Sequence, residues 1–170
     1  PVPEPTMKAL RIEGSGTAPK DGLYDTIESY RFECKYAHGF TMIVADTSQF
    51  ALGVRFEGTD GWIWVRRGAI EASREELITA PLPANAERLY VSQDHMGNFF
   101  DCVRSRKDPI CDVETGHRSA SECHLAIISL RLGRKLQWDV KQEKFIGDGA
   151  KEGNAWLARE MRKPYTYSFV

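Results

Sequence analysis

Long apolar runs and an excess of charge of one sign are both missing from this sequence. No segment approaches the ~20 consecutive apolar residues that a helix needs to cross a bilayer. The 23 basic and 24 acidic residues leave a net charge of −1, which argues against a dominant electrostatic footprint for nucleic acid or a membrane surface. The first residues also lack a signal-peptide pattern. We therefore expect neither partner, and a cytoplasmic location, or a periplasmic one if a targeting segment precedes the chain.

Metal-binding patterns are missing as well. The four cysteines, Cys34, Cys102, Cys111 and Cys123, include no CxxC pair and no zinc-like spacing. The histidines do not match HExxH. We predict no metal site, and free thiols that are buried or partly buried in a reducing compartment. A Cys102–Cys111 disulfide is the alternative.

The phosphate-binding glycine fingerprint of dinucleotide enzymes is also absent. No GxGxxG follows a predicted strand, and Gly14–Gly16 lacks both the third glycine and a following helix. The sequence around Ser119 and Ser121 has no nucleophile-elbow pattern, so we propose no hydrolase triad. We therefore predict no cofactor-binding residue and assign no catalytic residue in this chain.

The composition is that of a globular domain. With 170 residues, 42% of them hydrophobic and 28% charged, the chain is long enough to bury a core of its own. Alternating apolar residues predict strands in the first half: Lys8–Glu13, Thr26–Tyr36, Phe40–Asp46, Val54–Glu57, Gly61–Arg66 and Ala69–Ala72. A helical turn at Ser73–Leu77, two longer helices, edge strands at Leu136–Trp138 and Lys144–Ile146, and a helix at Asn154–Arg159 follow. This order predicts an α+β fold, a mainly antiparallel sheet with helices packed on one face.

The two longer helices have recognisable boundaries. The first runs from His95 to Ser105, with an apolar stripe at helical spacing: Met96, Phe99, Phe100 and Val103. The second is predicted to start at Ser119, which has capping-box spacing with Glu122, and to stop at Gly133. Its predicted core stripe is Ala120, Cys123, Ile127 and Leu130, with Leu125, Ile128 and Leu132 beside it. Both helices are expected to pack against the sheet.

Several separated motifs occur together in a familiar order. They are Gly22–Thr26 (GLYDT), the turn Tyr36–Gly39, Val54–Gly68, the long stretch His95–Asp139, Phe145–Asp148, Ala155–Leu157 and Arg162–Tyr165. In this order they resemble the C-terminal domain of the Gfo/Idh/MocA oxidoreductases, in a bacterial branch. The resemblance covers nearly the whole chain. It implies that residues 1–170 form one C-terminal substrate and oligomerisation domain, without the N-terminal Rossmann domain and the family's catalytic lysine and histidine motifs.

The resemblance implies a function for the parent protein. Such an enzyme moves hydride between NAD or NADP and a hydroxyl-bearing carbon of a sugar, cyclitol or related polyol, and the cofactor supplies the chemistry. The chain alone is then expected to be inactive. Two alternatives stay open: an NAD-dependent glycosidase of the same family, and a non-catalytic binding or assembly module.

Three residues are candidates for contact with substrate. His95 opens a predicted helix, where a local capping role is the alternative. His117 and Arg118 precede the predicted start of the second helix, where backbone donors favour anions. A contact with substrate, or with the cofactor domain, is the hypothesis for this pair.

The aromatic residues of the strands suggest an interface. One layer of helices is not expected to cover all of these side chains, which are Tyr30, Phe32, Trp62 and Trp64. An uncovered aromatic face often marks a contact surface. We expect homo-oligomerisation through the sheet, since symmetric pairing is the simplest closed arrangement. A sheet core, a sugar-stacking platform and coverage by the Rossmann half are the alternatives.

Overall fold

The computed structural model describes residues 10–88 and 90–166. The chain forms two compact units. The first unit comprises residues 1–46 and 117–170, and the second comprises residues 47–116. Each is described by itself below.

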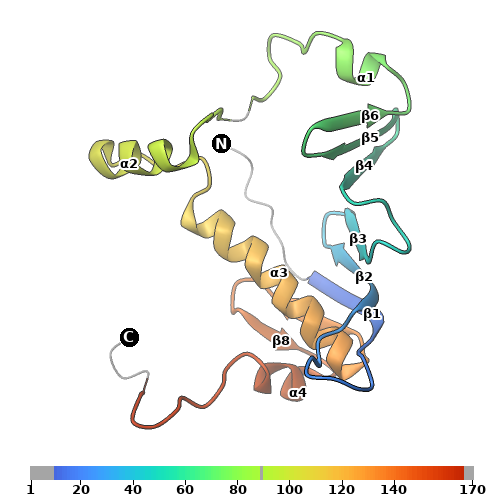
Figure 1. Ribbon diagram of the computed structural model, residues 1–170, viewed down its shortest axis with the longest axis vertical. Helices are drawn as coiled ribbons and strands as arrows, with labels where there is room; N and C mark the ends of the chain where they lie inside the picture. The colour runs from blue at the N-terminus through green and yellow to red at the C-terminus, as the bar shows by residue number, and fades with distance from the viewer. Residues whose placement is uncertain (1–9, 89, 167–170) are drawn as a thin grey trace. The chain divides into compact units, whose positions relative to one another are not determined.

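The first unit contains a five-stranded antiparallel sheet in the order β3-β2-β1-β7-β8 (Figure 1). Its strands are β1 (Leu10–Thr17), β2 (Ser29–Tyr36), β3 (Thr41–Ala45), β7 (Leu136–Asp139) and β8 (Lys144–Ile146). Segments from the two ends of the sequence therefore meet in one sheet, because β1 pairs with β2 on one side and with β7 on the other. The predicted antiparallel α+β architecture is confirmed.

Strand β1 extends further than predicted. Lys8 and Ala9 lie outside the described residues, whereas Gly14–Thr17, expected as a loop, continue the strand and pair with β2. A Cβ atom on Gly14 would lie 2.5 Å from Cβ of Phe32. Glycine at this position thus permits a close approach of two strands, and its low strand propensity misled the prediction.

The hydrophobic core lies between this sheet and helix α3 (Val113–Leu132). Alternate strand residues point into it, as expected for a sheet covered on one face. The buried strand residues are Leu10, Ile12, Phe32, Cys34, Leu136, Trp138 and Phe145, and the helix contributes Leu125, Ala126, Ile128 and Leu130. The packing of this helix on one face of the sheet agrees with the prediction.

The buried face of α3 agrees only in part with the prediction, because Leu130 of the predicted stripe is buried together with Leu125 and Ile128 beside it. Ile127, placed in the core stripe, is 41% exposed, whereas the neighbouring Ile128 is 5% exposed. Ala120 and Cys123 of the same stripe are also exposed. The helix face centred near Leu125 and Ser129 packs on the sheet. The Ser129 hydroxyl donates to the backbone oxygen of Arg134 at 2.9 Å. A buried serine that bonds a backbone oxygen is compatible with a core position.

Helix α3 also starts earlier than predicted, at Val113 instead of Ser119. The Asp112 carboxylate accepts from the backbone N–H of Thr115 at 2.9 Å and from its hydroxyl at 2.8 Å. Aspartate is a strong N-cap residue, and here it satisfies the backbone N–H of Thr115 in the first turn. The end is as predicted, because Gly133 has a φ of 59° and terminates the helix.

Helix α4 (Ala150–Ala155) lies against β8 and begins before the predicted Asn154. Asn154 instead joins the helix to the strand. Its side chain accepts from the Phe145 N–H at 2.8 Å and donates to the Phe145 oxygen at 2.9 Å. A Cβ on Gly153 would lie 2.6 Å from the Phe145 ring, so only glycine fits this close contact.

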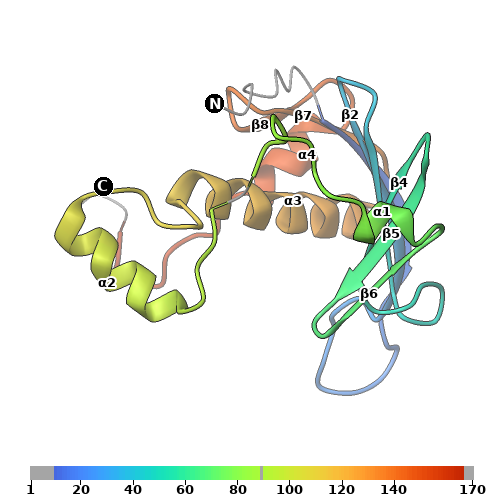
Figure 2. The ribbon, with the colours of Figure 1, turned by 90° about the horizontal axis from the view of Figure 1, so that it is seen from above.

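The second unit has a three-stranded antiparallel sheet in the order β4-β5-β6 (Figure 2). The strands are β4 (Val54–Gly58), β5 (Gly61–Arg66) and β6 (Ala69–Ala72), close to the predicted ranges. Helix α1 (Glu76–Thr79) follows, later than the predicted turn. Ser73 does not cap it; its hydroxyl oxygen accepts from the backbone N–H of Trp62 at 3.0 Å.

Helix α2 (His95–Ser105) has the predicted bounds but not the predicted packing. Its apolar stripe is 46–58% exposed, and the buried residue of the helix is Asn98. The Asn98 side chain accepts from the backbone N–H of Ile110 at 3.0 Å and donates to the Tyr90 hydroxyl. These hydrogen bonds connect α2 to the chain segments before and after it. The side of α2 that carries Asn98 is therefore covered, and the apolar stripe is not.

All four cysteines are free. Cys34 is buried and Cys102 is half-buried, as expected, whereas Cys111 and Cys123 are exposed. None of the helices in the described part of the chain is both long and apolar enough to span a membrane.

Candidate functional site

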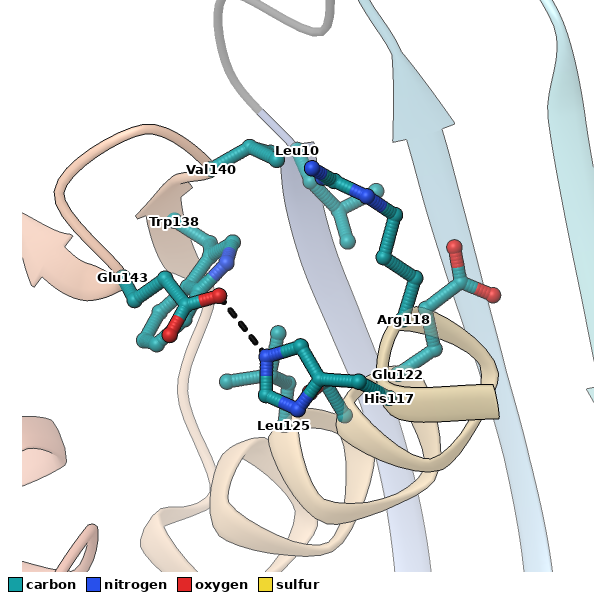
Figure 3. A pocket seen from close by; sticks show the side chains of 9 residues that line it. Leu10, His117, Arg118, Glu122, Leu125, Trp138, Val140 and Glu143 are labelled. Carbon is teal, nitrogen blue, oxygen red and sulfur yellow. Dashed lines mark hydrogen bonds and ion pairs between the residues drawn. The ribbon is translucent and has the colours of Figure 1, made fainter. Parts of the chain in front are cut away.

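A small cavity lies in the first unit between α3 and the end of the sheet where β1 begins and β7 ends (Figure 3). Its floor is apolar, formed by Leu10, Leu125, Trp138 and Val140. Its rim is polar, formed by His117, Arg118, Ser121, Glu122 and Glu143. An apolar hollow bordered by convergent polar groups is the usual form of a small-molecule site.

Helix α3 provides four of the five rim residues. His117 and Ser121 are four residues apart, as are Arg118 and Glu122, so all four side chains share one helix face. Asp112 fixes the start of the helix one turn earlier. The rim is therefore mounted on a rigid element whose position is set by the core below it.

The turn between β7 and β8 provides the fifth rim residue. The Asp139 carboxylate accepts from the backbone N–H groups of Lys141 and Gln142, both at 2.9 Å, which fixes the turn. Glu143 then adopts a φ of 48°, in the left-handed region. This conformation brings Oε1 of Glu143 to 2.7 Å from Nε2 of His117, which is drawn as the dashed line in Figure 3.

Tyr36 ties the rim to the sheet. Its hydroxyl donates to Oε1 of Glu122 at 2.7 Å. Burial, followed by this bond to an acidic partner, raises the pKa of Tyr36, so the phenol keeps its proton and remains a donor. The Tyr36 ring also lies 5.2 Å from that of Phe40 and 5.8 Å from that of His38, at the tip of the β2–β3 hairpin. Aromatic side chains thus extend the surface beyond the rim.

The size of the cavity limits what it can hold. At about 30 Å³ it has room for a water molecule or one ligand substituent, but not for a sugar ring. The rim offers carboxylate, hydroxyl, imidazole and guanidinium groups, which recognise hydroxyl-bearing ligands. No cluster of three metal-ligating side chains occurs among the described residues. The arrangement is suited to bind and orient a polar ligand.

The structure places the predicted substrate-proximal residues in different units. His117 and Arg118 both line the cavity, although they lie within α3 and not before its N-terminus. His95 is the first residue of α2 in the second unit, where Asp94 and not His95 caps the helix by accepting from Gly97 N at 3.0 Å.

Sequence reasoning missed Glu122, Glu143 and Tyr36 as partners of this site. The Glu143–His117 and Tyr36–Glu122 contacts join residues 26 and 86 positions apart. No local pattern connects such distant positions.

The predicted interface residues also fall into two groups. Phe32 is buried in the core of the first unit and Tyr30 packs against it, so they lie on the face that α3 covers. Trp62 and Trp64 lie on one face of the second unit's sheet and are half-buried. The guanidinium carbon of Arg55 lies 4.5 Å from the centre of the Trp62 ring, a cation–π contact.

The opposite face of that small sheet is apolar. The register pairs Val54 with Val65, Phe56 with Ile63, and Val65 with Ile70. Val54, Phe56 and Ile70 are all more than half exposed. These three residues, which we call the β4–β6 apolar face, are more exposed than the half-buried tryptophans.

Comparison with known proteins identifies a family for the chain. Residues 15–167 match the family described as the oxidoreductase family, C-terminal alpha/beta domain. No curated protein and no solved structure shows significant similarity to the chain. The match covers most of the sequence and agrees with the sheet and helices described above. The chain therefore belongs to the Gfo/Idh/MocA oxidoreductases, as a C-terminal domain of that family.

Proposed function

We propose that this chain forms the substrate side of an NAD(P)-dependent oxidoreductase that acts on a sugar, cyclitol or related polyol. Family membership supports the oxidoreductase assignment. The observation that carries the substrate class is the rim of the α3 cavity, where two carboxylates, a serine hydroxyl and a histidine converge. Carboxylates accept hydrogen bonds from hydroxyl groups, and serine and histidine both donate and accept them.

The N-termini of the two longer helices, α2 and α3, do not fit the pyrophosphate of a dinucleotide. A pyrophosphate group binds at helix N-termini whose backbone donors are open and preceded by glycine. Here the carboxylates of Asp94 and Asp112 accept from the first turns of α2 and α3, and Glu114 adds a negative charge to the start of α3. An anion is disfavoured at both places. In our proposal NAD or NADP binds to residues outside this chain, and the α3 cavity orients the substrate.

The proposed role of the cavity is to hold one hydroxyl-bearing substituent while the rest of the ligand lies over the rim. Its volume of about 30 Å³ sets this limit. The aromatic rings of Tyr36, His38 and Phe40 provide an adjoining surface on which the apolar face of a sugar ring can pack. The apolar floor formed by Leu125 and Trp138 excludes bulk water, which strengthens polar contacts at the rim.

Titration with a polyol tests this proposal. We expect millimolar myo-inositol or glucose to shift the amide resonances of residues 117–122 and 140–143 of the ¹⁵N-labelled chain in a saturable way. Residues of the β4–β6 sheet serve as the internal control and should not shift. Shifts confined to the second unit, or none up to 100-fold the protein concentration, would contradict the assignment of the site.

We also propose that two copies of the chain associate through the β4–β6 apolar face. Phe56 and Ile70 are exposed there, and exposed apolar patches on sheets commonly mark protein contacts. Light scattering should report a dimer at tens of micromolar. Phe56→Glu should give a monomer, whereas Glu57→Lys, on the opposite face of the same strand, should not. A monomeric parent chain, or equal effects of the two variants, would refute this interface.

The proposed location is the cytoplasm. The chain carries four free thiols, two of them exposed at Cys111 and Cys123. Exposed free thiols are compatible with a reducing compartment.

A further inference from the structure

We propose that Glu143 is a positioning residue for His117. In this proposal its carboxylate holds the imidazole with the proton on Nε2, so that Nδ1 accepts a hydrogen bond from a ligand hydroxyl. The proposal rests on the proposed function for the ligand, but the contact between the two side chains is independent of it. The ligand group is named by its chemistry, a hydroxyl donor of a polyol.

The backbone of Glu143 is the first observation. A φ of 48° is uncommon for any residue except glycine, asparagine and aspartate. Asp139 already fixes the turn through two backbone hydrogen bonds, and glycine would suit the left-handed position better. The turn itself therefore does not require a glutamate. We infer that the glutamate side chain serves the contact with His117.

The second observation is the direction of the hydrogen bond. An ionised carboxylate only accepts, so the contact of 2.7 Å between Oε1 of Glu143 and Nε2 of His117 needs a proton on Nε2. In the neutral ring, Nδ1 is then an acceptor. Figure 3 shows this second nitrogen on the side of the ring away from Glu143. His117 is half exposed, and the proposal places the ligand hydroxyl at Nδ1.

The charged surroundings do not provide a competing anchor for Nε2. Arg118 and Glu122 border the same cavity from α3, and Glu122 accepts from Tyr36 of β2. The carboxylate at the β7–β8 turn is the group that meets the ring. A hydrogen bond between two side chains that are each about half exposed gives little stability. Its effect is to restrict the orientation of the ring.

The experiment compares the wild-type chain with Glu143→Gly and Glu143→Gln. Glycine suits the left-handed backbone and removes the carboxylate, whereas glutamine keeps an oxygen that can accept from Nε2. The ring of His117 should be ordered in the wild type and in Glu143→Gln. In Glu143→Gly the ring should have a lower order parameter. His124, exposed on the same helix, is the internal reference and should not change.

Polyol binding is the second readout. The dissociation constant for myo-inositol should rise about tenfold in Glu143→Gly, as expected for one oriented hydrogen bond, and return close to the wild-type value in Glu143→Gln. Ring order that is identical in all three proteins would overturn the positioning role. A ring that loosens in Glu143→Gly, while no polyol binds any of the proteins, upholds the positioning role and refutes the proposed function.

Discussion

Two adjacent isoleucines of α3 provide a matched test of which helix face packs on the sheet. Ile127 and Ile128 have the same chemistry and the same helix, but the first is 41% exposed and the second is 5% exposed. Ile128 belongs to the core cluster with Leu125 and the buried residues of β1 and β2. Truncation to alanine should therefore have very different consequences at the two positions.

The magnitudes follow from burial. Ile128→Ala removes buried methyl and methylene groups and leaves a cavity, at a cost of about 3 kcal/mol within the usual range of ~2–5 kcal/mol. Ile127→Ala removes a side chain that is partly in water already and leaves no closed cavity, at a cost of about 1 kcal/mol. For a chain of this size each kcal/mol lowers Tm by roughly 2–4 °C. The expected decreases are about 6–12 °C for Ile128→Ala and about 2–4 °C for Ile127→Ala.

Circular dichroism at 222 nm during heating, together with urea denaturation, measures both variants against the wild type. Unchanged m-values would show that the two substitutions act on stability and not on the extent of unfolding. Equal decreases in Tm, or a larger decrease for Ile127→Ala, would show that the face of α3 assigned to the core is wrong.

Four further predictions concern the core, one thiol and the cofactor. Ser129→Ala should cost about 1–3 kcal/mol in urea denaturation, because the backbone oxygen of Arg134 loses a buried donor. Gly153→Ala should cost about 1–3 kcal/mol in the same assay, because its Cβ would lie 2.6 Å from the Phe145 ring. Burial raises the pKa of the Cys34 thiol from 9.0 to about 12, so iodoacetamide at pH 8 should label the other three cysteines first. Since the unfolded thiol ionises near pH 9 and the folded one does not, Cys34 should lower stability progressively as pH rises from about 9 to 12, and Cys34→Ala should flatten that part of the profile. A fluorescence titration with NADH should show no saturable binding to this chain, and a dissociation constant near 1 μM, or about −8 kcal/mol, would contradict that expectation.

Local patterns predicted much of the fold. The ranges of β5, β6, β8 and α2 agree with the structure, because alternation, helical periodicity and turn residues are all encoded within a few positions. The errors had two causes, a contact between distant residues and a misleading local cap pattern. Gly14 was assigned to a loop, since its close approach to Phe32 is visible only across the strand pair. The start of α3 was misplaced because Ser119 and Glu122 have capping-box spacing, whereas Asp112 makes the cap.

The candidate site was predicted only in part, because its contacts join residues that are distant in the sequence. His117 and Arg118 stood out because they precede the predicted start of a helix, and both line the cavity. Their partner Glu143 comes from a separate turn, so no sequence window contains the contact. Phe32 was predicted to be an interface residue, but it lies in the core. The strand pattern alone does not tell which face of the sheet a residue occupies. The burial of Phe32 under α3 depends on which side of the sheet that helix covers.

The assignment of the α3 cavity as the substrate-facing site is tested most directly by comparing two histidines of one helix. His117 lies on the cavity rim, whereas His124 is exposed and is not among the residues that line the cavity. The measurement is the dissociation constant for myo-inositol, from amide shifts of the wild-type, His117→Asn and His124→Asn chains. We predict at least a tenfold weaker affinity for His117→Asn, from loss of an oriented hydrogen bond, and no change for His124→Asn. Equal affinities in all three chains, or a loss confined to His124→Asn, would contradict the account.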